Sequence, residues 1–410
     1  EMLNGEREAF SGKRIILGIT NDNMVKTVKC PKSRYLAFKT GGDLWCYDQT
    51  DNELVRIFTF DSSKDDGIRS RYDRHDVKIL SVQEDGTVDF LVYGYMNRGK
   101  YEGHMGVIYY SYDAEKDTVN EKFYLAASES FEKIREDIST LSYLSQNSMM
   151  YLMLEGSVYG IDLKSNEFLV VAQGLTKGSF AVSGDGSRIA WQDGASLYES
   201  EKVHVMDFNT AQKQEITGSE GDYVRVLGFV GNDLIYGFSN SGDKWIVNGR
   251  MKGMPMYAMY IVDNEMQVES EYRKDGIYIS DVVAEDGRIH LKRLVRISEN
   301  QYMYQDQDTI VCNQKVDDGE LKGIGYFASQ DRGRVYYVQT DSDLNGDKVN
   351  ISAPRAFSYE FASTLDISFA ATAQADTGMV FHAYGGGHYL GCSRSFGTAV
   401  NMAYGQMGFV

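Results

Sequence analysis

The sequence predicts an all-β protein, a seven-bladed β-propeller, with six or eight blades as the alternatives. Seven times an apolar strand leads into a tight polar turn and a second apolar strand follows. The repeats are roughly 50 residues long, which suits one blade each. Tyrosine is abundant at 29 residues and proline is scarce at 3, and both biases favour half-buried strands. The turns centre near Lys32, Asp85, Asn147, Asp185, Asn232, Asp286 and Asp331.

The first strand of the chain is expected to close the ring. Residues 13–19 carry the apolar run Ile15, Ile16 and Leu17 and precede the first full blade. We expect them to form the outer strand of the last blade and to pair with the segment near residues 356–361, because closure removes an exposed sheet edge. The predicted propeller domain then spans residues 1–365.

Each blade is expected to begin with a hairpin. In the fourth blade, strands at 180–183 and 188–191 flank the turn Gly184-Asp185-Gly186-Ser187. An Asp-Gly pair suits a two-residue hairpin, because glycine tolerates a positive φ. The third strand of a blade ends in an aspartate, which can accept hydrogen bonds from the amides of its own turn. Runs of this kind occupy residues 44–48, 107–113, 158–162, 203–207 and 259–263.

These paired phrases resemble the TolB-like and WD40-like repeats of bacterial cell-surface propellers. The resemblance covers about residues 26–360 and implies the fold, while that fold serves binding proteins, hydrolase accessories and lyases alike. Gly184 stands where those repeats usually have proline. The resemblance further implies an extracellular or cell-envelope protein of a bacterium.

The pattern changes after residue 365, and residues 366–410 are expected to form a partial α/β module. A strand at 379–384, a glycine turn at 385–387 and an extended segment precede residues at helical spacing, from Phe396 to Met407. Gly408 then ends the helix. This strand–hairpin–helix–strand order is similar to half of a SPOR-like peptidoglycan-binding repeat, and we expect the natural protein to continue past Val410.

Charge and cysteine usage exclude several functional classes. The net charge of −17 repels phosphate backbones, so nucleic-acid binding is not expected. No apolar run reaches the roughly 18 residues that a membrane-spanning helix needs. The four cysteines contain no Cys-x-x-Cys pair, which argues against zinc and thioredoxin-type sites.

Long insertions are expected to share one face of the propeller and to bind the partner there. They fall at residues 94–106 and 239–255, with further length at 61–75 and 341–348. Loops on a rigid scaffold commonly carry binding, and aromatic and arginine side chains are the usual anchors. The expected recognition residues are Tyr95, Arg98, Tyr101, Trp245 and Arg250. The alternative is that these insertions have no role in binding.

One loop matches the first half of a calcium-binding loop. Oxygen ligands would come from Asp341, Asp343, Asn345 and Asp347, with Gly346 at the sixth position. Ser352 stands where such a loop has its bidentate glutamate, so a metal-free turn is the alternative.

No catalytic constellation can be assembled from the sequence. His388 and Cys392 are close along the chain, yet no third group orients them as a nucleophile pair. The expected function is therefore a non-catalytic envelope propeller that binds a protein, peptide or glycan through its insertion face. The alternative is a propeller enzyme, a glycan lyase or hydrolase, with carboxylates and tyrosines at the central funnel.

Overall fold

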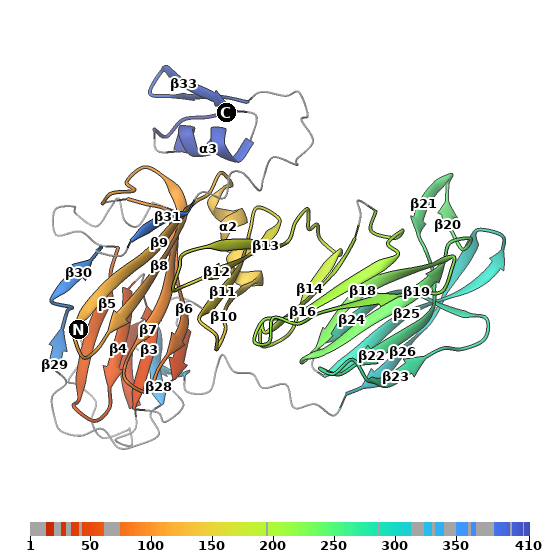
Figure 1. The fold of residues 1–410 in the computed structure, drawn as a ribbon, viewed down its shortest axis with the longest axis horizontal. Coiled ribbons are helices and arrows are strands. Elements are labelled where there is room, and N and C mark those ends of the chain that lie inside the picture. Colours follow the sequence, from red (N-terminus) through yellow and green to blue (C-terminus); the bar gives the residue numbers. More distant parts are fainter. Residues whose placement is uncertain are drawn as a thin grey trace. The chain divides into compact units, whose positions relative to one another are not determined.

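The computed structural model describes residues 14–19, 26–29, 34–40, 43–60, 74–97, 99–193, 196–285, 287–312, 324–329, 333–339, 350–359, 362–365, 381–393, 396–404 and 406–410. These residues belong to two compact units. Unit 1 comprises residues 1–137 and 318–410, and unit 2 comprises residues 138–317. The described chain is built almost entirely of strands, with helices α2 (Phe131–Thr140) and α3 (Phe396–Tyr404) (Figure 1). The all-β fold class is therefore confirmed.

Unit 1 contains two large sheets, each a four-stranded antiparallel meander with extra strands on its outer edge. The first has the order β2-β3-β4-β5-β29 and the second has the order β30-β9-β8-β7-β6, with β31 also paired to β9. Their strands are β2 (Lys26–Lys29), β3 (Tyr35–Thr40), β4 (Asp43–Asp48), β5 (Glu53–Phe58), β6 (His75–Val82), β7 (Val88–Tyr95), β8 (Met105–Asp113), β9 (Thr118–Ala126), β29 (Asn350–Ser352), β30 (Ala356–Ser358) and β31 (Ser363–Leu365). The extra strands β29, β30 and β31 all run parallel to the strands that they join.

Unit 2 repeats the same meander three times. Its strands are β10 (Ser142–Leu144), β11 (Met149–Leu154), β12 (Ser157–Asp162), β13 (Phe168–Ala172), β14 (Phe180–Val182), β15 (Arg188–Gln192), β16 (Lys202–Asp207), β17 (Lys213–Thr217), β18 (Asp222–Val230), β19 (Asp233–Asn240), β22 (Met256–Val262) and β23 (Val268–Tyr272). A three-stranded antiparallel run follows, of β24 (Ile277–Glu285), β25 (Arg288–Ser298) and β26 (Gln301–Val311), and it joins the third meander through β22. The insertion at 239–255 forms the small hairpin of β20 (Trp245–Val247) and β21 (Arg250–Gly253).

The strand pairs that flank all seven predicted turns are confirmed as antiparallel partners. The turn residues Lys32, Asp286 and Asp331 themselves lie outside the described residues. In the fourth repeat the predicted turn at residues 184–187 is confirmed, although it is not a two-residue hairpin loop. The Ser183 amide bonds to the Arg188 carbonyl at 3.0 Å, which leaves a four-residue loop. Its Gly186 has the expected positive φ, at 76°.

The aspartates at the ends of the third strands cap their own turns, as predicted. Asp48 accepts a hydrogen bond from the Thr50 amide at 2.8 Å, and Asp162 accepts one from the Lys164 amide at 2.7 Å. Asp263 accepts one from the Glu265 amide at 2.8 Å. In each of these meanders the fourth strand begins five or six residues after the capping aspartate.

The expected partner of the N-terminal strand is wrong. Strand β1 (Arg14–Ile19) pairs antiparallel with β28 (Gly333–Gln339), which also pairs with β27 (Ile324–Ser329). The segment expected to receive β1, near residue 356, instead forms β30 and hydrogen-bonds to the outer edge of β9. The number of blades and the closure of a ring stay predictions.

The C-terminal segment contains the expected hairpin and helix. Strands β32 (Phe381–Gly385) and β33 (His388–Ser393) pair antiparallel, α3 follows, and Phe409 returns to pair with Tyr384. Among the residues that the structure describes, no helix is both long enough and apolar enough to cross a bilayer.

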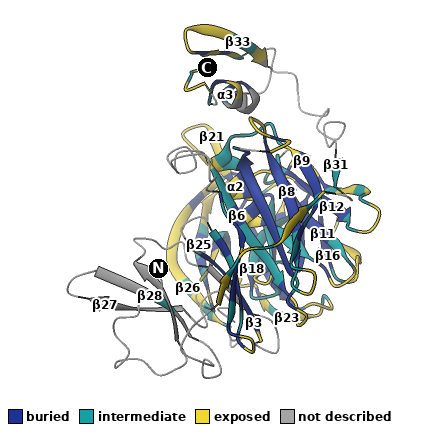
Figure 2. Cartoon of the chain, turned by 90° about the vertical axis from the view of Figure 1, so that its left-hand side faces the viewer, coloured by how far each residue is buried: buried dark blue, intermediate teal, exposed yellow. Residues whose placement is uncertain are grey.

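The core of unit 1 lies on its central strands. Every residue of β7 is buried, and β8 is buried at all but two positions (Figure 2). The larger cluster gathers Phe58, Phe90, Val92, Ile108 and Tyr110 from both sheets. Strands β7 and β8 also carry side chains that line a cavity of unit 1.

Candidate ligand-binding cavity

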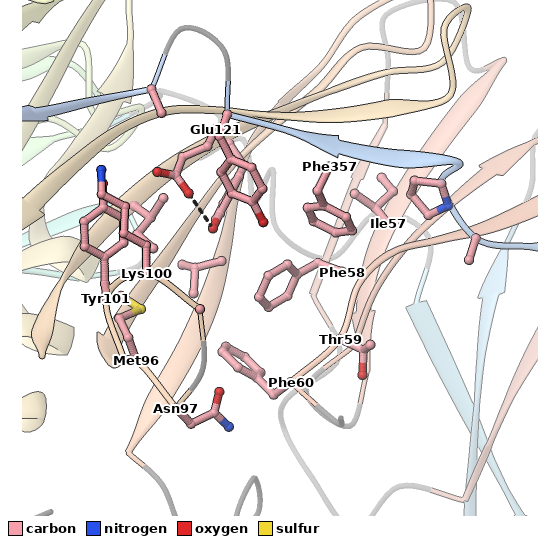
Figure 3. A pocket seen from close by; sticks show the side chains of 18 of the residues that line it. Ile57, Phe58, Thr59, Phe60, Met96, Asn97, Lys100, Tyr101, Glu121 and Phe357 are labelled. Carbon is pink, nitrogen blue, oxygen red and sulfur yellow. Dashed lines mark hydrogen bonds between the residues drawn. The ribbon is translucent and has the colours of Figure 1, made fainter. Parts of the chain in front are cut away.

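Unit 1 holds a cavity of about 720 Å³ that is lined by residues from both of its large sheets. Strand β5 and the residues after it form one wall, strands β7, β8 and β9 form another, and the segment at 353–362 forms the rim. The described side chains around it are mostly apolar or aromatic (Figure 3). The residues that line it are Arg56, Ile57, Phe58, Thr59, Phe60, Val92, Met96, Asn97, Gly99, Lys100, Tyr101, Ile108, Tyr110, Glu121, Ala353, Pro354, Phe357, Tyr359 and Ala362.

The aromatic wall follows from strand periodicity, because alternate residues of a strand share one face. Phe58 packs edge-on against Phe60, with ring centroids 5.0 Å apart, and its ring lies 5.9 Å from that of Tyr110. Tyr110 and Ile108 are alternate residues of β8, and both reach the cavity. This wall is set by the same packing that forms the core.

The predicted insertion at residues 94–106 contributes the opposite wall. Its loop is closed by its own backbone hydrogen bonds, from Gly103 to Met96 at 2.8 Å and from Met96 to His104 at 2.9 Å. Tyr101 stacks on Tyr124 at 3.9 Å, and the Lys100 ammonium lies 5.0 Å from the centre of the Tyr101 ring. The described residues of the insertion therefore form part of the cavity wall.

The rim comes from a distant part of the sequence. Strands β29, β30 and β31 pair in parallel with the edges of β5 and β9. Phe357 is 41% exposed and Tyr359 is 58% exposed, although both line the cavity. The Tyr101 hydroxyl reaches Thr364 at 3.4 Å. Aromatic surface is thus presented to solvent at the mouth of the cavity.

Glu121 is a buried carboxylate in this apolar setting. It stands directly opposite Tyr110 across the β8–β9 pair, and the Tyr110 hydroxyl donates to its Oε2 at 3.2 Å. Only 3% of Glu121 is exposed, and its Oε1 has no hydrogen-bond partner among the described residues. Burial raises the pKa of Glu121, and the Tyr110 and Tyr101 hydroxyls and the Lys100 charge oppose that rise.

The sequence-predicted recognition residues divide between the two units. In unit 1, Tyr101 lines the cavity, while Tyr95 is buried with its ring 5.6 Å from that of Tyr404. In unit 2, Trp245 is buried beside Tyr304 with the Lys252 ammonium 4.3 Å from its ring centre, and Arg250 is exposed on β21. Arg98 lies outside the described residues. That these residues share one recognition face stays a prediction.

The predicted calcium ligands Asp341, Asp343, Asn345 and Asp347 also lie outside the described residues. Within the described part of the chain, no group of three or more His, Cys, Asp or Glu side chains could hold a metal ion. The calcium prediction is therefore untested.

Sequence reasoning did not find Glu121, although the sequence contains a signal for it. Val119, Glu121 and Phe123 are alternate residues of β9, so their side chains share one face of the strand, and all three are buried. A carboxylate in phase with buried apolar residues is unusual, because burying an unpaired charge is costly. The rim residues Phe357 and Tyr359 had no comparable local signal.

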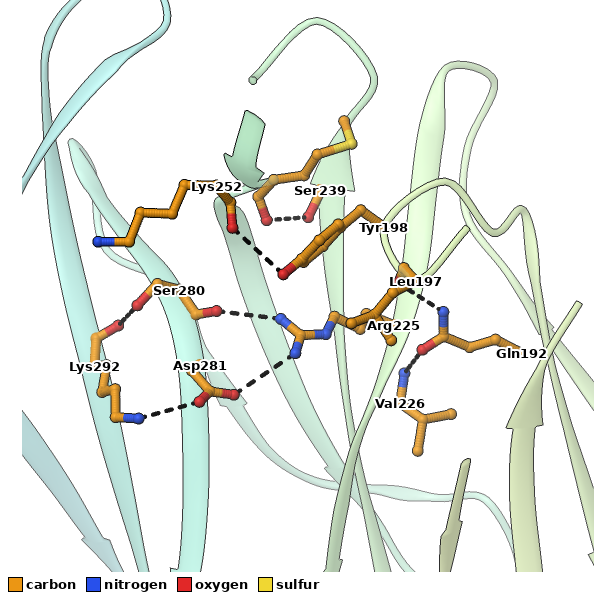
Figure 4. Close-up of polar contacts among 11 residues, drawn as sticks. Gln192, Leu197, Tyr198, Arg225, Val226, Ser239, Lys252, Ser280, Asp281 and Lys292 are labelled. Carbon is orange, nitrogen blue, oxygen red and sulfur yellow. Dashed lines mark hydrogen bonds and ion pairs between the residues drawn. The ribbon is translucent and has the colours of Figure 1, made fainter. Parts of the chain in front are cut away.

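Unit 2 has a polar cluster that connects neighbouring repeats (Figure 4). Arg225 on β18 donates to the Ser280 carbonyl at 3.2 Å and pairs with Asp281 of β24 at 3.7 Å. Lys292 approaches the other oxygen of Asp281 at 3.1 Å. Gln192 of β15 accepts a hydrogen bond from the Val226 amide at 3.0 Å. These contacts fix adjacent strands to one another, and two cations compensate the charge of Asp281.

Comparisons with known proteins add little to this geometry. No family model matches the chain, and no curated protein sequence matches it. Among solved structures it is similar to the WD40 domain of SCAP from fission yeast, with 13% identity over 79% of this chain and 86% of that chain, at a TM-score of 0.33. It is also similar to a conserved lipoprotein from Clostridium novyi NT, with 14% identity over 33% of this chain and 86% of that one, at a TM-score of 0.26. The tricorn protease gives 11% identity over 84% and 36% of the two chains, at a TM-score of 0.32. Likenesses at these TM-scores carry no argument about fold or function.

Proposed function

We propose that this chain is a non-catalytic β-propeller of the bacterial cell envelope that binds a protein, peptide or glycan, and that the cavity of unit 1 is its main binding site. The observation that carries the proposal is the cavity, which the insertion at 94–106 helps to line. Its volume of about 720 Å³ lies in the range of pockets that enclose small ligands or side chains.

The mouth of the cavity has the properties of a recognition surface. Exposed aromatic rings give large contact area with few rotatable bonds, so binding through them costs little conformational entropy. Phe357 and Tyr359 present such area next to the ordered insertion loop. Tyr95, Arg98, Trp245 and Arg250 are proposed as further recognition residues, and Asp341, Asp343, Asn345 and Asp347 as ligands of a calcium ion.

Binding should weaken when the aromatic rim is truncated. We expect Phe357→Ala and Tyr101→Ala each to lower affinity for captured peptides or glycans by roughly 10- to 30-fold, the effect typical of an aromatic anchor. Peptide and glycan arrays identify the ligand, and titration calorimetry measures the loss.

Tyr389→Ala provides the matched control, because Tyr389 is 53% exposed on β33 and does not line the cavity. It should bind as the wild type does. Normal binding by both cavity variants, with folding intact by circular dichroism, would show that the cavity is not the site.

Among the described residues of the cavity, the enzyme alternative has one carboxylate to draw on, the buried Glu121. A glycan lyase or hydrolase would need a carboxylate poised for proton transfer or attack. In the cluster of Figure 4, Asp281 is already engaged by Arg225 and Lys292. Those pairs stabilise its ionised form and suit a structural role.

A further inference from the structure

The carboxylate of Glu121 is only half satisfied in the described structure. Its Oε2 receives the Tyr110 hydroxyl at 3.2 Å and the nearby Tyr101 hydroxyl lowers its pKa, but its Oε1 makes no hydrogen bond to a described residue and only 3% of the residue is exposed. A buried acceptor that has lost water without gaining a partner costs roughly the full desolvation of that group. The Glu121 carboxylate carries this desolvation cost beside a cavity that is large enough to admit another molecule.

The described cationic side chains around the cavity do not supply a hydrogen bond to Glu121 Oε1. Lys100 is exposed and lies beside the Tyr101 ring, where its charge only moderates the pKa of Glu121. Arg56 is also exposed, lies 5.8 Å from the Trp45 ring centre and approaches Asp43 at 3.8 Å. No hydrogen bond joins either side chain to Oε1 in the described residues.

The surroundings of the carboxylate define the rest of the ligand. Figure 3 shows Glu121 beside the cavity, with Phe58, Phe60 and Phe357 on one side and Met96, Lys100 and Tyr101 on the other. Aromatic and thioether side chains favour a flat apolar body. Because Glu121 is one of the residues that line this space, a molecule that fills it would bring its polar end toward the Glu121 carboxylate.

We propose that the cavity takes an organic amine, a cationic ammonium on an aromatic or other apolar body, with Glu121 Oε1 accepting the hydrogen bond from its N–H. The inference rests on the proposed binding function and names the chemical class of its ligand. An ammonium is the donor that compensates the carboxylate in charge as well as in hydrogen bonding, and buried charges in proteins are normally paired in this way.

Three matched probes test the selectivity of the wild-type chain: naphthylethylamine, naphthylethanol and naphthylacetate. They share a flat apolar body and differ in the charge of the polar end. Titration calorimetry at neutral pH should show the amine binding about tenfold or more tighter than the alcohol, as expected for a hydrogen bond between charged partners. The acid should bind most weakly. This order needs no substitution and does not depend on the folding of a variant.

Glu121→Gln should lower the affinity for naphthylethylamine by about tenfold or more and leave that for naphthylethanol nearly unchanged. Glu102→Gln is the control, because Glu102 is exposed on the same insertion and does not line the cavity. It should keep the wild-type order. Thermal melts establish that both variants are folded.

Two failures are distinguishable. Equal binding of the three probes, or tighter binding of the acid, would overturn the amine assignment while leaving the cavity as a binding site. Failure of all three probes to bind wild type, together with normal capture by Phe357→Ala and Tyr101→Ala, would overturn the proposed function as well.

Discussion

Asp233 and Glu121 are both buried acidic side chains, yet their neighbours differ. Glu121 has a tyrosine partner and apolar surroundings, whereas Asp233 on β19 stands near other carboxylates. Burial and the charges of Glu269 and Asp263 raise the pKa of Asp233 to about 6 from 3.8, and Arg188 opposes the rise. Arg188 is only 2% exposed and donates to the Asn232 carbonyl and the Asn264 side chain, each at 2.9 Å.

The raised pKa of Asp233 predicts stability that falls as pH rises. The protonated form is favoured in the folded state, so its contribution is complete below pH 3.8 and is lost as pH rises through about 6. Asp233→Asn should therefore stabilise the protein by roughly 1–3 kcal/mol at neutral pH, with the gain disappearing in acid. Urea denaturation across this pH range measures the difference.

Asp275→Asn, at an exposed position in the same unit, should leave the unfolding free energy nearly unchanged throughout. A less stable Asp233→Asn variant at neutral pH would show that the aspartate is held by favourable contacts instead of repelled by its neighbours.

At the scale of elements, the hairpins were predictable because their signals are local. Gly186 supplies a positive φ in its turn, and Asp48 and Asp162 bond to amides two residues ahead. Such signals sit within a few residues of one another, and sequence patterns record them directly. The bounds of the turn at residues 184–187 were predictable for the same reason, while its hydrogen-bond pattern depends on how the two strands meet.

The parallel strands β29, β30 and β31 were not predictable in the same way. Each has three residues, and the pairing partner lies far back in the sequence, as in the pairing of Ile351 with Leu54. Short segments carry little periodicity, and no turn specifies a partner at that distance. These strands carry the rim of the cavity, so the cavity could not be predicted without their pairing. The insertion at residues 94–106 could be predicted, because it is a local feature of the sequence.

The loop at residues 341–347 allows a separate test of the calcium prediction. Saturating calcium should raise the melting temperature relative to chelator, because a ligand that binds only the folded state stabilises it by about 2.7 kcal/mol at a hundredfold excess over Kd. Asp343→Ala should abolish the shift, while Asp317→Ala, outside the motif, should retain it. A melting temperature that is the same in calcium and in chelator would identify the loop as a metal-free turn.

At the scale of the whole molecule, unit 1 is discontinuous in sequence. It joins residues 1–137 to residues 318–410, and unit 2 accounts for the chain between them. Within the described part of the chain, the outer edges of β5 and β9 receive their partners from strands β29, β30 and β31. Unpaired edges of this kind expose hydrogen-bonding groups and promote association.

A chain ending at residue 349 should therefore lose cavity binding and expose apolar surface. Without β29, β30 and β31, the cavity lacks Phe357 and Tyr359 and the edges of β5 and β9 are open. We expect affinity for naphthylethylamine to fall at least tenfold, by loss of aromatic contacts, and a hydrophobic dye to bind more strongly. A chain ending at residue 365 keeps these strands and should behave as the full chain; equal behaviour of both truncations would contradict the assignment.

The contact between Tyr101 and Thr364 joins residues 263 positions apart in the chain. A molecule seated in the cavity would touch both of those regions and act as a reversible cross-link between them. Strands β30 and β31 would then be held against the rest of unit 1 by the ligand as well as by their own pairing with β9, so binding should slow their local unfolding. Hydrogen exchange of the amides of β30 and β31 would report this effect as added protection in the presence of the ligand.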